Sequence, residues 1–269
     1  MSAFPFDNIA EDYDNQFTST RTGQLQRQRV YHFLSLLLKK ENIQTVLEFN
    51  CGTGEDACWL AEKGYTVLAT DNSKEMIQVA QKKAVKKLKE NIHVPDFQVV
   101  ALENLSAIST EKKFDLIFSN FGGLNCLSPQ QFQKWADETT SLLSPNGFVV
   151  AVVLGRFCAW ESLYFLLKRN WSAAWRRLNK NAIDAPLGDN VSIPIWYYSP
   201  KMLTNFFSKK FKIIKIRPIG CALPPSYLDP FFLKRPSFLS FLNKMEKQFG
   251  NQKIWANLSD HYLVIMQKR

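Results

Sequence analysis

Short apolar runs alternate with amphipathic stretches over the first part of the chain. The apolar runs predict buried strands, and segments with apolar residues three or four positions apart predict helices. The predicted strands are Thr45–Phe49, Thr66–Thr70, Phe97–Val100, Phe114–Ser119 and Phe148–Leu154. The predicted helices are Gln24–Lys40, Glu55–Glu62, a helix capped by Ser73 that reaches about Glu90, and Pro129–Leu143. This alternation favours an α/β fold with a parallel sheet between helices.

The pattern changes beyond the fifth predicted strand. Phe157–Asn181 predicts one or two helices rich in tryptophan and arginine, and Lys201–Ser208 predicts another. Phe211–Pro218 and Tyr262–Gln267 predict two further strands, with a Pro- and Phe-rich stretch between them. We therefore expect a single domain over residues 1–269. Its additions would be an N-terminal cap at 1–40, a helical lid insertion at about 155–200 and a Pro/Phe-rich insertion at about 221–258.

A glycine-bearing turn joins the first predicted strand to the next helix. Gly52 and Gly54 would let backbone N–H groups approach a ligand, and the helix N-terminus adds partial positive charge. Asp71 comes one helix and one strand later, where ribose hydroxyls of a nucleotide would lie. The spacing predicts a nucleotide-cofactor site. Because Gly52–Ala57 also fits a GxGxxA fingerprint, an NAD(P)-dependent oxidoreductase of Rossmann type is an alternative.

Composition narrows the class of protein. Hydrophobic residues make up 46% and charged residues 22% of the chain, which is typical of a globular protein. The net charge of +10 is compatible with nucleic acid, anionic lipid or an acidic substrate. A non-catalytic basic protein that binds lipid or nucleic acid is therefore a second alternative.

Cysteine and histidine usage indicates the compartment and argues against a metal site. The five cysteines form no CxxC pair, which is typical of reduced cytosolic thiols, and the three histidines are isolated, so we expect no metal. We find neither a secretory signal nor an apolar run near the ~20 residues of a membrane span. We expect a cytoplasmic protein.

Several segments resemble, in the same order, the motifs of class I S-adenosylmethionine-dependent methyltransferases. The chain is most similar to the small-molecule type that includes quinone-biosynthesis C-methyltransferases. The matching segments are Phe6–Asp14 (FD-x-IA-x-x-YD), Leu47–Gly54 (E/D-x-G-x-G-x-G), Asp71–Met76 (D-x-S-x-x-M), Leu102–Leu105 (D-A-E-x-L), Phe114–Ser119 and Leu142–Gly147 (LL-x-PGG). Asn50 replaces the first glycine of the E/D-x-G-x-G-x-G motif, and Ala101 stands where the family often has an aspartate.

The resemblance implies a fold, a cofactor and an activity. The fold would be a Rossmann-like, doubly wound, seven-stranded sheet, mostly parallel with an antiparallel last strand. S-adenosyl-L-methionine would donate a methyl group to an O, N or C atom of a small, apolar molecule. The implied cofactor-binding residues are Tyr13, Arg27, Glu48, Asn50, Cys51, Gly52, Gly54, Asp71, Asn72, Met76, Leu102, Glu103, Asn120 and Phe121.

Roles for individual residues come from the same resemblance. Asp71 would accept both ribose hydroxyls, and Met76 and Leu102 would enclose the adenine ring. Tyr13 and Arg27 would hold the cofactor carboxylate, although Arg21 and Arg29 compete with Arg27 for that role. We assign no catalytic residue, because orienting the acceptor supplies much of the acceleration in methyl transfer.

The residues after the fourth predicted strand narrow the class of substrate. Ser119–Gly122 lacks the Asp/Asn-Pro-Pro-aromatic motif of amino-methylating DNA enzymes, so nucleic acid is disfavoured as the substrate.

His261 is one of only three side chains with an ordinary pKa near neutrality, and we expect it to be structural.

Trp160–Leu178 carries apolar residues at helical spacing with Lys168, Arg169, Arg176 and Arg177 beside them. Three interpretations remain open. The segment is a substrate lid, an interfacial helix that contacts anionic lipid at the inner face of a membrane, or a core helix with a solvated basic face.

Overall fold

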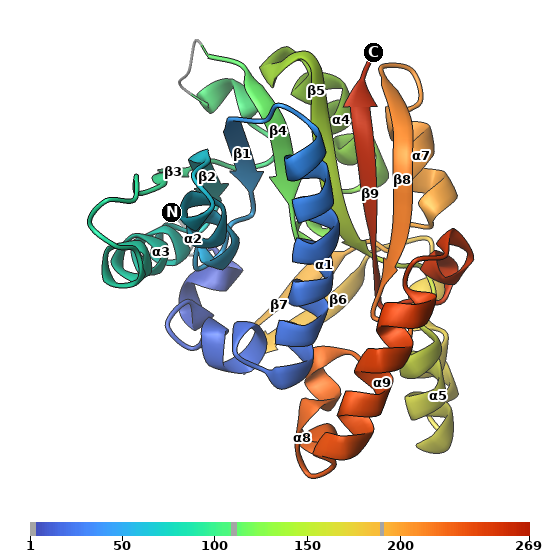
Figure 1. Ribbon diagram of the computed structural model, residues 1–269. Coiled ribbons are helices and arrows are strands. Elements are labelled where there is room, and N and C mark those ends of the chain that lie inside the picture. Colours follow the sequence, from blue (N-terminus) through green and yellow to red (C-terminus); the bar gives the residue numbers. More distant parts are fainter. Residues whose placement is uncertain (1–3, 109–111, 189–190) are drawn as a thin grey trace.

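The computed structural model describes residues 4–108, 112–188 and 191–269, and its centre is a seven-stranded sheet in the order β3-β2-β1-β4-β5-β9-β8 (Figure 1). The strands are β1 (Thr45–Phe49), β2 (Thr66–Asp71), β3 (Asp96–Val99), β4 (Phe114–Ser119), β5 (Leu143–Leu154), β8 (Phe211–Ile219) and β9 (His261–Lys268). Strands β1 to β5 pair in parallel, whereas β9 runs antiparallel to both β5 and β8. The predicted sheet, including its antiparallel last strand, is confirmed.

Helices cover both faces of this sheet (Figure 1). One apolar cluster joins the sheet to α1, α2 and α3, and another joins it to α4 and α7. Because side chains alternate along a strand, β5 supplies Val149 and Ala151 to one cluster and Val150 and Val152 to the other. The helices are α1 (Arg21–Lys40), α2 (Glu55–Glu62), α3 (Lys74–Lys87), α4 (Pro129–Leu142) and α7 (Pro200–Phe207).

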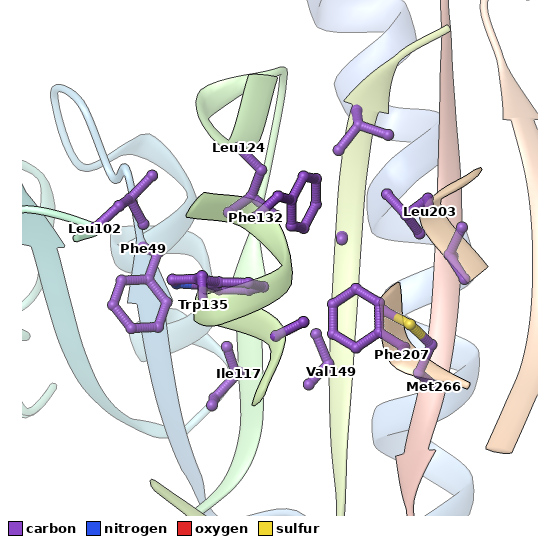
Figure 2. Close-up of a cluster of buried hydrophobic side chains, with 14 of the residues drawn as sticks. Phe49, Leu102, Ile117, Leu124, Phe132, Trp135, Val149, Leu203, Phe207 and Met266 are labelled. Carbon is purple, nitrogen blue, oxygen red and sulfur yellow. The ribbon is translucent and has the colours of Figure 1, made fainter. Parts of the chain in front are cut away.

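Aromatic side chains fill the cluster beneath α4 and α7. Figure 2 shows Trp135 of α4 beside Phe49 of β1, and their ring centroids lie 5.6 Å apart. Phe207 of α7 lies near Val149 and Met266 in the same view. This packing fixes the strands whose carboxyl ends carry the candidate site.

Most of the remaining elements gather near the carboxyl ends of the parallel strands (Figure 1). They are η1 (Pro5–Ile9), η2 (Asp14–Thr18), α5 (Ala159–Leu167), α6 (Trp171–Ala174), η5 (Arg176–Leu178), β6 (Ile183–Gly188), β7 (Val191–Ile195), η6 (Ser226–Leu228), α8 (Asp229–Leu233) and α9 (Pro236–Phe249). Within the described residues, no helix combines the length and the apolar character that crossing a bilayer requires.

The insertion expected to be helical at about 155–200 is only partly so. It contains α5 and α6, but β6 and β7 form an antiparallel hairpin in its second half. The hairpin buries Leu187, Ile193 and Ile195 against Ile9 and Met76. The alternation of apolar residues in β7 is a strand pattern, and the expectation of helix overlooked it.

Candidate cofactor site

The turn after β1 has left-handed backbone conformations at three positions. Asn50 has φ 55°, Gly52 has φ 52° and Gly54 has φ 75°. A Cβ at Gly54 would also lie 2.8 Å from the Cβ of Ala80 in α3, so both backbone and packing require glycine there. Asparagine is among the residues that tolerate this region best, and the turn therefore persists despite the loss of the first glycine.

The Asn50 side chain occupies the space that a side chain on Gly123 would need. The Asn50 amide donates to Ser119 Oγ at 3.3 Å, and a Cβ on Gly123 would overlap the Asn50 side chain. We expect Gly123→Ala to lower the free energy of unfolding by about 1–3 kcal/mol through overpacking. With Asn50→Gly already present, the same change should cost much less, and urea denaturation of the four proteins would measure this coupling. Equal costs in both backgrounds would contradict the contact.

Asp71 ends β2 beside this turn and is 8% exposed. Its carboxylate accepts hydrogen bonds from the backbone N–H of Gly52 at 2.9 Å and of Ser73 at 3.0 Å. Burial raises the pKa of Asp71, and these N–H donors partly oppose that rise. Since a carboxylate offers about four lone-pair sites, the two fixed oxygens retain capacity for further hydroxyl donors.

Glu48 in β1 is the least satisfied acid near the turn. It is 1% exposed, and its Oε2 makes no hydrogen bond within the described part of the chain. Burial, reinforced by the charge of Asp56, raises the pKa of Glu48 well above its usual value. Buried carboxylates normally have donors, so this oxygen fits a site that a cationic ligand group completes.

The N-terminal segment, which contains η1 and η2, lies over the turn after β1. A Cβ added at Gly52 would be 3.8 Å from Cε1 of Tyr13, so the tyrosine ring lies beside that glycine. Burial raises the pKa of Tyr13 to about 12, although the charge of Arg27 opposes the rise. The phenol therefore stays protonated at neutral pH and can donate a hydrogen bond.

Two sets of polar contacts fasten this segment, and the sequence pattern did not indicate them. Lys83 of α3 pairs with Asp14 at 2.6 Å, and Thr53 Oγ1 donates to the same carboxylate at 2.6 Å. Ser73 Oγ donates to Asp7 at 2.6 Å. The segment is thereby tied to both α3 and the glycine turn.

Arg27 is the arginine of α1 that reaches the site. It forms an ion pair with Asp56 and lies over the ring of Phe121, 5.0 Å from the ring centroid. Of its competitors, Arg21 is exposed and Arg29 donates instead to Asn251 at 2.8 Å. Arg27 therefore fits the predicted position better than either.

Asp56 is a buried residue of the site that the sequence pattern did not single out. Besides Arg27, it accepts from the Tyr31 hydroxyl at 2.7 Å and from Asn120 Nδ2 at 2.9 Å. Asn120 in turn accepts from the backbone N–H of Phe121 at 3.0 Å. The acidity of Asp56 in the first turn of α2 was the only sequence signal, because its partners come from distant segments.

The predicted adenine side is less closely assembled. Met76 packs with the N-terminal segment and the β6–β7 hairpin, whereas Leu102 belongs to the cluster beneath α4, so enclosure of adenine by both stays a prediction. Asn72 is half-buried next to Asp71, and Glu103 is exposed. Cys51 is buried, and its backbone N–H donates to the carbonyl of Thr70 at 3.0 Å.

His261 lies beyond Phe121, with the two ring centroids 5.3 Å apart. Its Nδ1 is 3.2 Å from Asp260 Oδ2, and Asp260 also pairs with Arg177 at 2.8 Å. Arg177 further pairs with Glu161 at 2.8 Å. This buried network joins the last strand to the first insertion.

A family model and one curated relative each match part of the chain. Residues 46–147 match a family model described as a methyltransferase domain. Mouse glycine N-methyltransferase is 28% identical over 125 residues, which are 42% of this chain and 41% of that protein. The chain thus matches less than half the length of this curated relative.

Solved structures are similar over nearly the whole chain. The CcbJ methyltransferase of Streptomyces caelestis matches with TM-score 0.64 and 16% identity, covering 99% of this chain and 98% of that one. An S-adenosylmethionine-dependent methyltransferase of Clostridium acetobutylicum matches with TM-score 0.58 and 13% identity, covering 97% and 98%. The N-methyltransferase NodS of Bradyrhizobium japonicum, solved with S-adenosyl-L-homocysteine, matches with TM-score 0.53 and 14% identity, covering 93% and 89%. At these identities the likeness establishes the fold.

Proposed function

We propose that this chain transfers a methyl group from S-adenosylmethionine to a small molecule. In support, residues 46–147 match a methyltransferase domain, and the fold is that of S-adenosylmethionine-dependent methyltransferases. The observation that carries the proposal is a pair of buried carboxylates, Glu48 and Asp71, on either side of a left-handed glycine turn. Among the residues that the structure describes, none donates to one oxygen of Glu48, whereas Asp71 is held by two backbone N–H groups.

Each part of the site has a task in this proposal. Bound S-adenosylmethionine supplies an electrophilic methyl group on a sulfonium. Glu48 accepts from the ammonium of the methionyl part, and Asp71 accepts from the ribose hydroxyls. Gly52 and Gly54 allow the backbone to approach, while Tyr13 covers the turn and excludes water. Phe121, held by Arg27 and Asn120, limits the space beside the reacting methyl.

A pocket beside the N-terminal segment supports a small molecule as the acceptor. An open pocket of about 760 Å³ lies between η2, the first turns of α1 and the segment from η6 to α8. Tyr227 forms one of its walls, and the Tyr227 hydroxyl donates to Glu161 at 3.0 Å. Gln16 and Gln24 add polar groups to the lining. Leu25 and Leu233 add apolar groups, so we propose an acceptor with an apolar part and a polar group, and an enzyme that works in peripheral contact with a membrane.

The oxidoreductase alternative is not favoured. A dinucleotide-binding sheet in its common form has six strands in the order 3-2-1-4-5-6. In this chain the antiparallel strand β9 lies between β5 and β8 instead.

Isothermal titration of the purified protein tests the proposal. We expect S-adenosylmethionine and S-adenosylhomocysteine to bind with micromolar affinity, about 8 kcal/mol of binding free energy, and NADH not to bind. Binding of NADH alone would favour the oxidoreductase function over methyl transfer. Absence of binding by all three ligands would overturn the proposed activity.

A further inference from the structure

The two insertions form one body at the end of the molecule where the parallel strands finish. Figure 1 shows α5, α8 and α9 together at this end. The ring centroids of Trp160 in α5 and Phe232 in α8 lie 5.8 Å apart. Buried Leu239 and Leu242 of α9 belong to the same apolar cluster. We call the outer surface of residues 159–180 and 226–249 the insertion face.

Large apolar side chains are concentrated on the insertion face. Of the seventeen that are exposed within the described residues, ten belong to it. Leu167 is 77% and Trp171 is 66% exposed. The ten are Leu163, Leu167, Trp171, Trp175, Leu178, Tyr227, Phe231, Leu233, Phe238 and Phe241. Such a concentration on a monomer marks an interaction surface.

The acids of the insertion face are all buried and engaged. Glu161 pairs with Arg176 and Arg177. Asp229 accepts from the backbone and hydroxyl of Thr22, at 2.8 and 2.6 Å. Glu246, 0% exposed, accepts from backbone N–H groups that include that of Ala222, at 2.7 Å.

The exposed charges of the insertion face are therefore all basic. They lie on both insertions, so the positive charge is spread across the face rather than confined to one helix. The exposed cations are Lys168, Arg169, Lys180, Lys234, Arg235, Lys244 and Lys247.

From this combination we infer that the insertion face docks on an anionic membrane surface. Lysine and arginine are attracted to an anionic leaflet, and tryptophan and phenylalanine favour the headgroup boundary. A nucleic acid would account for the cations but not for exposed aliphatic side chains such as Leu163 and Leu167. Docking here would place the acceptor side of the candidate site near the bilayer, where apolar molecules dissolve.

One face of α9 is exposed, and the opposite face packs into the buried cluster. Phe238 and Phe241 are exposed with their rings nearly parallel, at an interplanar angle of 14°, and Lys244 lies one turn later. Leu239 and Leu242 point instead into the buried cluster. Outward substitutions can therefore change docking without removing core residues.

Flotation of the full chain with phospholipid vesicles tests the inference. We expect binding to vesicles of phosphatidylcholine with phosphatidylglycerol, weaker binding to phosphatidylcholine alone, and a decrease as salt is raised. Lys234→Glu with Lys244→Glu should lower binding at least tenfold, as should Leu167→Ser with Phe241→Ser. Val85→Ser with Lys86→Glu, on the exposed side of α3, is the matched control and should bind as the wild type does.

Two results would overturn the inference. One is absence of binding to the anionic vesicles, whether or not the chain binds RNA or DNA in a salt-sensitive complex. The other is equal binding by the insertion-face variants and the α3 control. Titration of every variant with S-adenosylmethionine separates this outcome from the proposed methyl transfer, because the substituted residues lie outside the cofactor site.

Discussion

Asp71→Ala is expected to abolish measurable binding of S-adenosylmethionine while the protein remains folded. The substitution removes the acceptor proposed for two ribose hydroxyls, and hydrogen bonds to a charged group contribute about 1.5–3 kcal/mol each. The affinity should therefore fall by more than about 100-fold, because each 1.4 kcal/mol is a factor of ten. Isothermal titration with S-adenosylmethionine and S-adenosylhomocysteine would measure the loss.

The control for Asp71 is an acid on the adjacent strand. Asp96 in β3 is exposed, and its side chain accepts from Gln98 at 3.3 Å. Asp96→Ala should bind both ligands as the wild type does. Thermal unfolding of Asp71→Ala should remain cooperative, which excludes general collapse. An unchanged affinity in Asp71→Ala would contradict the assignment of this residue.

Arg177→Ala is expected to lower the free energy of unfolding by about 3–5 kcal/mol, the usual cost of removing one partner of a buried ion pair. Arg177 is 5% exposed and donates to both Glu161 and Asp260 at 2.8 Å. Without it the carboxylate of Asp260 stays buried with much less compensation. Urea denaturation at neutral pH would measure the change.

Deleting Trp160–Leu178 would remove the same arginine, so that deletion should destabilise the fold as well as impair turnover.

Arg176 provides a matched control on the adjacent position. Its side chain is 31% exposed and pairs with Glu161, so Arg176→Ala should cost about 1 kcal/mol or less. Similar losses in the two variants would contradict the distinction between the buried and the half-exposed arginine.

The same network predicts that the stability of the fold depends on pH in the acidic range. Burial by itself would raise the pKa of Asp260 and Glu161. For Asp260 the charges of His261 and Arg177 reverse this effect, and for Glu161 those of Arg177 and Arg176 do, so both pKa values are lowered. Groups with a lowered folded-state pKa stabilise the protein above their unfolded values, near pH 4, and that stabilisation is lost as the pH falls further. Urea denaturation over a series of acidic pH values should show a smaller loss for Arg177→Ala than for the wild type.

Local sequence patterns were enough to predict the strands and the glycine turn. Each of the seven strands was predicted within a few residues, except that β5 begins earlier, at Leu143. These features depend on neighbours along the chain, namely alternating or continuous apolar residues and the backbone freedom of Gly52 and Gly54. Such local patterns are readable without knowledge of the fold.

Which polar side chains meet depended on the packing of distant segments. Asn120 reaches Asp56 across 64 positions, and Arg177 reaches Asp260 across 83. This packing also decided that Arg27, rather than Arg21 or Arg29, pairs with Asp56 and lies over the ring of Phe121. A residue's type shows that it needs a partner when buried, but the partner is chosen by how helices and strands pack. For that reason the sequence predicted the glycine turn and the basic, aromatic stretch Trp160–Leu178, whereas the ion network and the joining of the two insertions into one face emerged only from the fold.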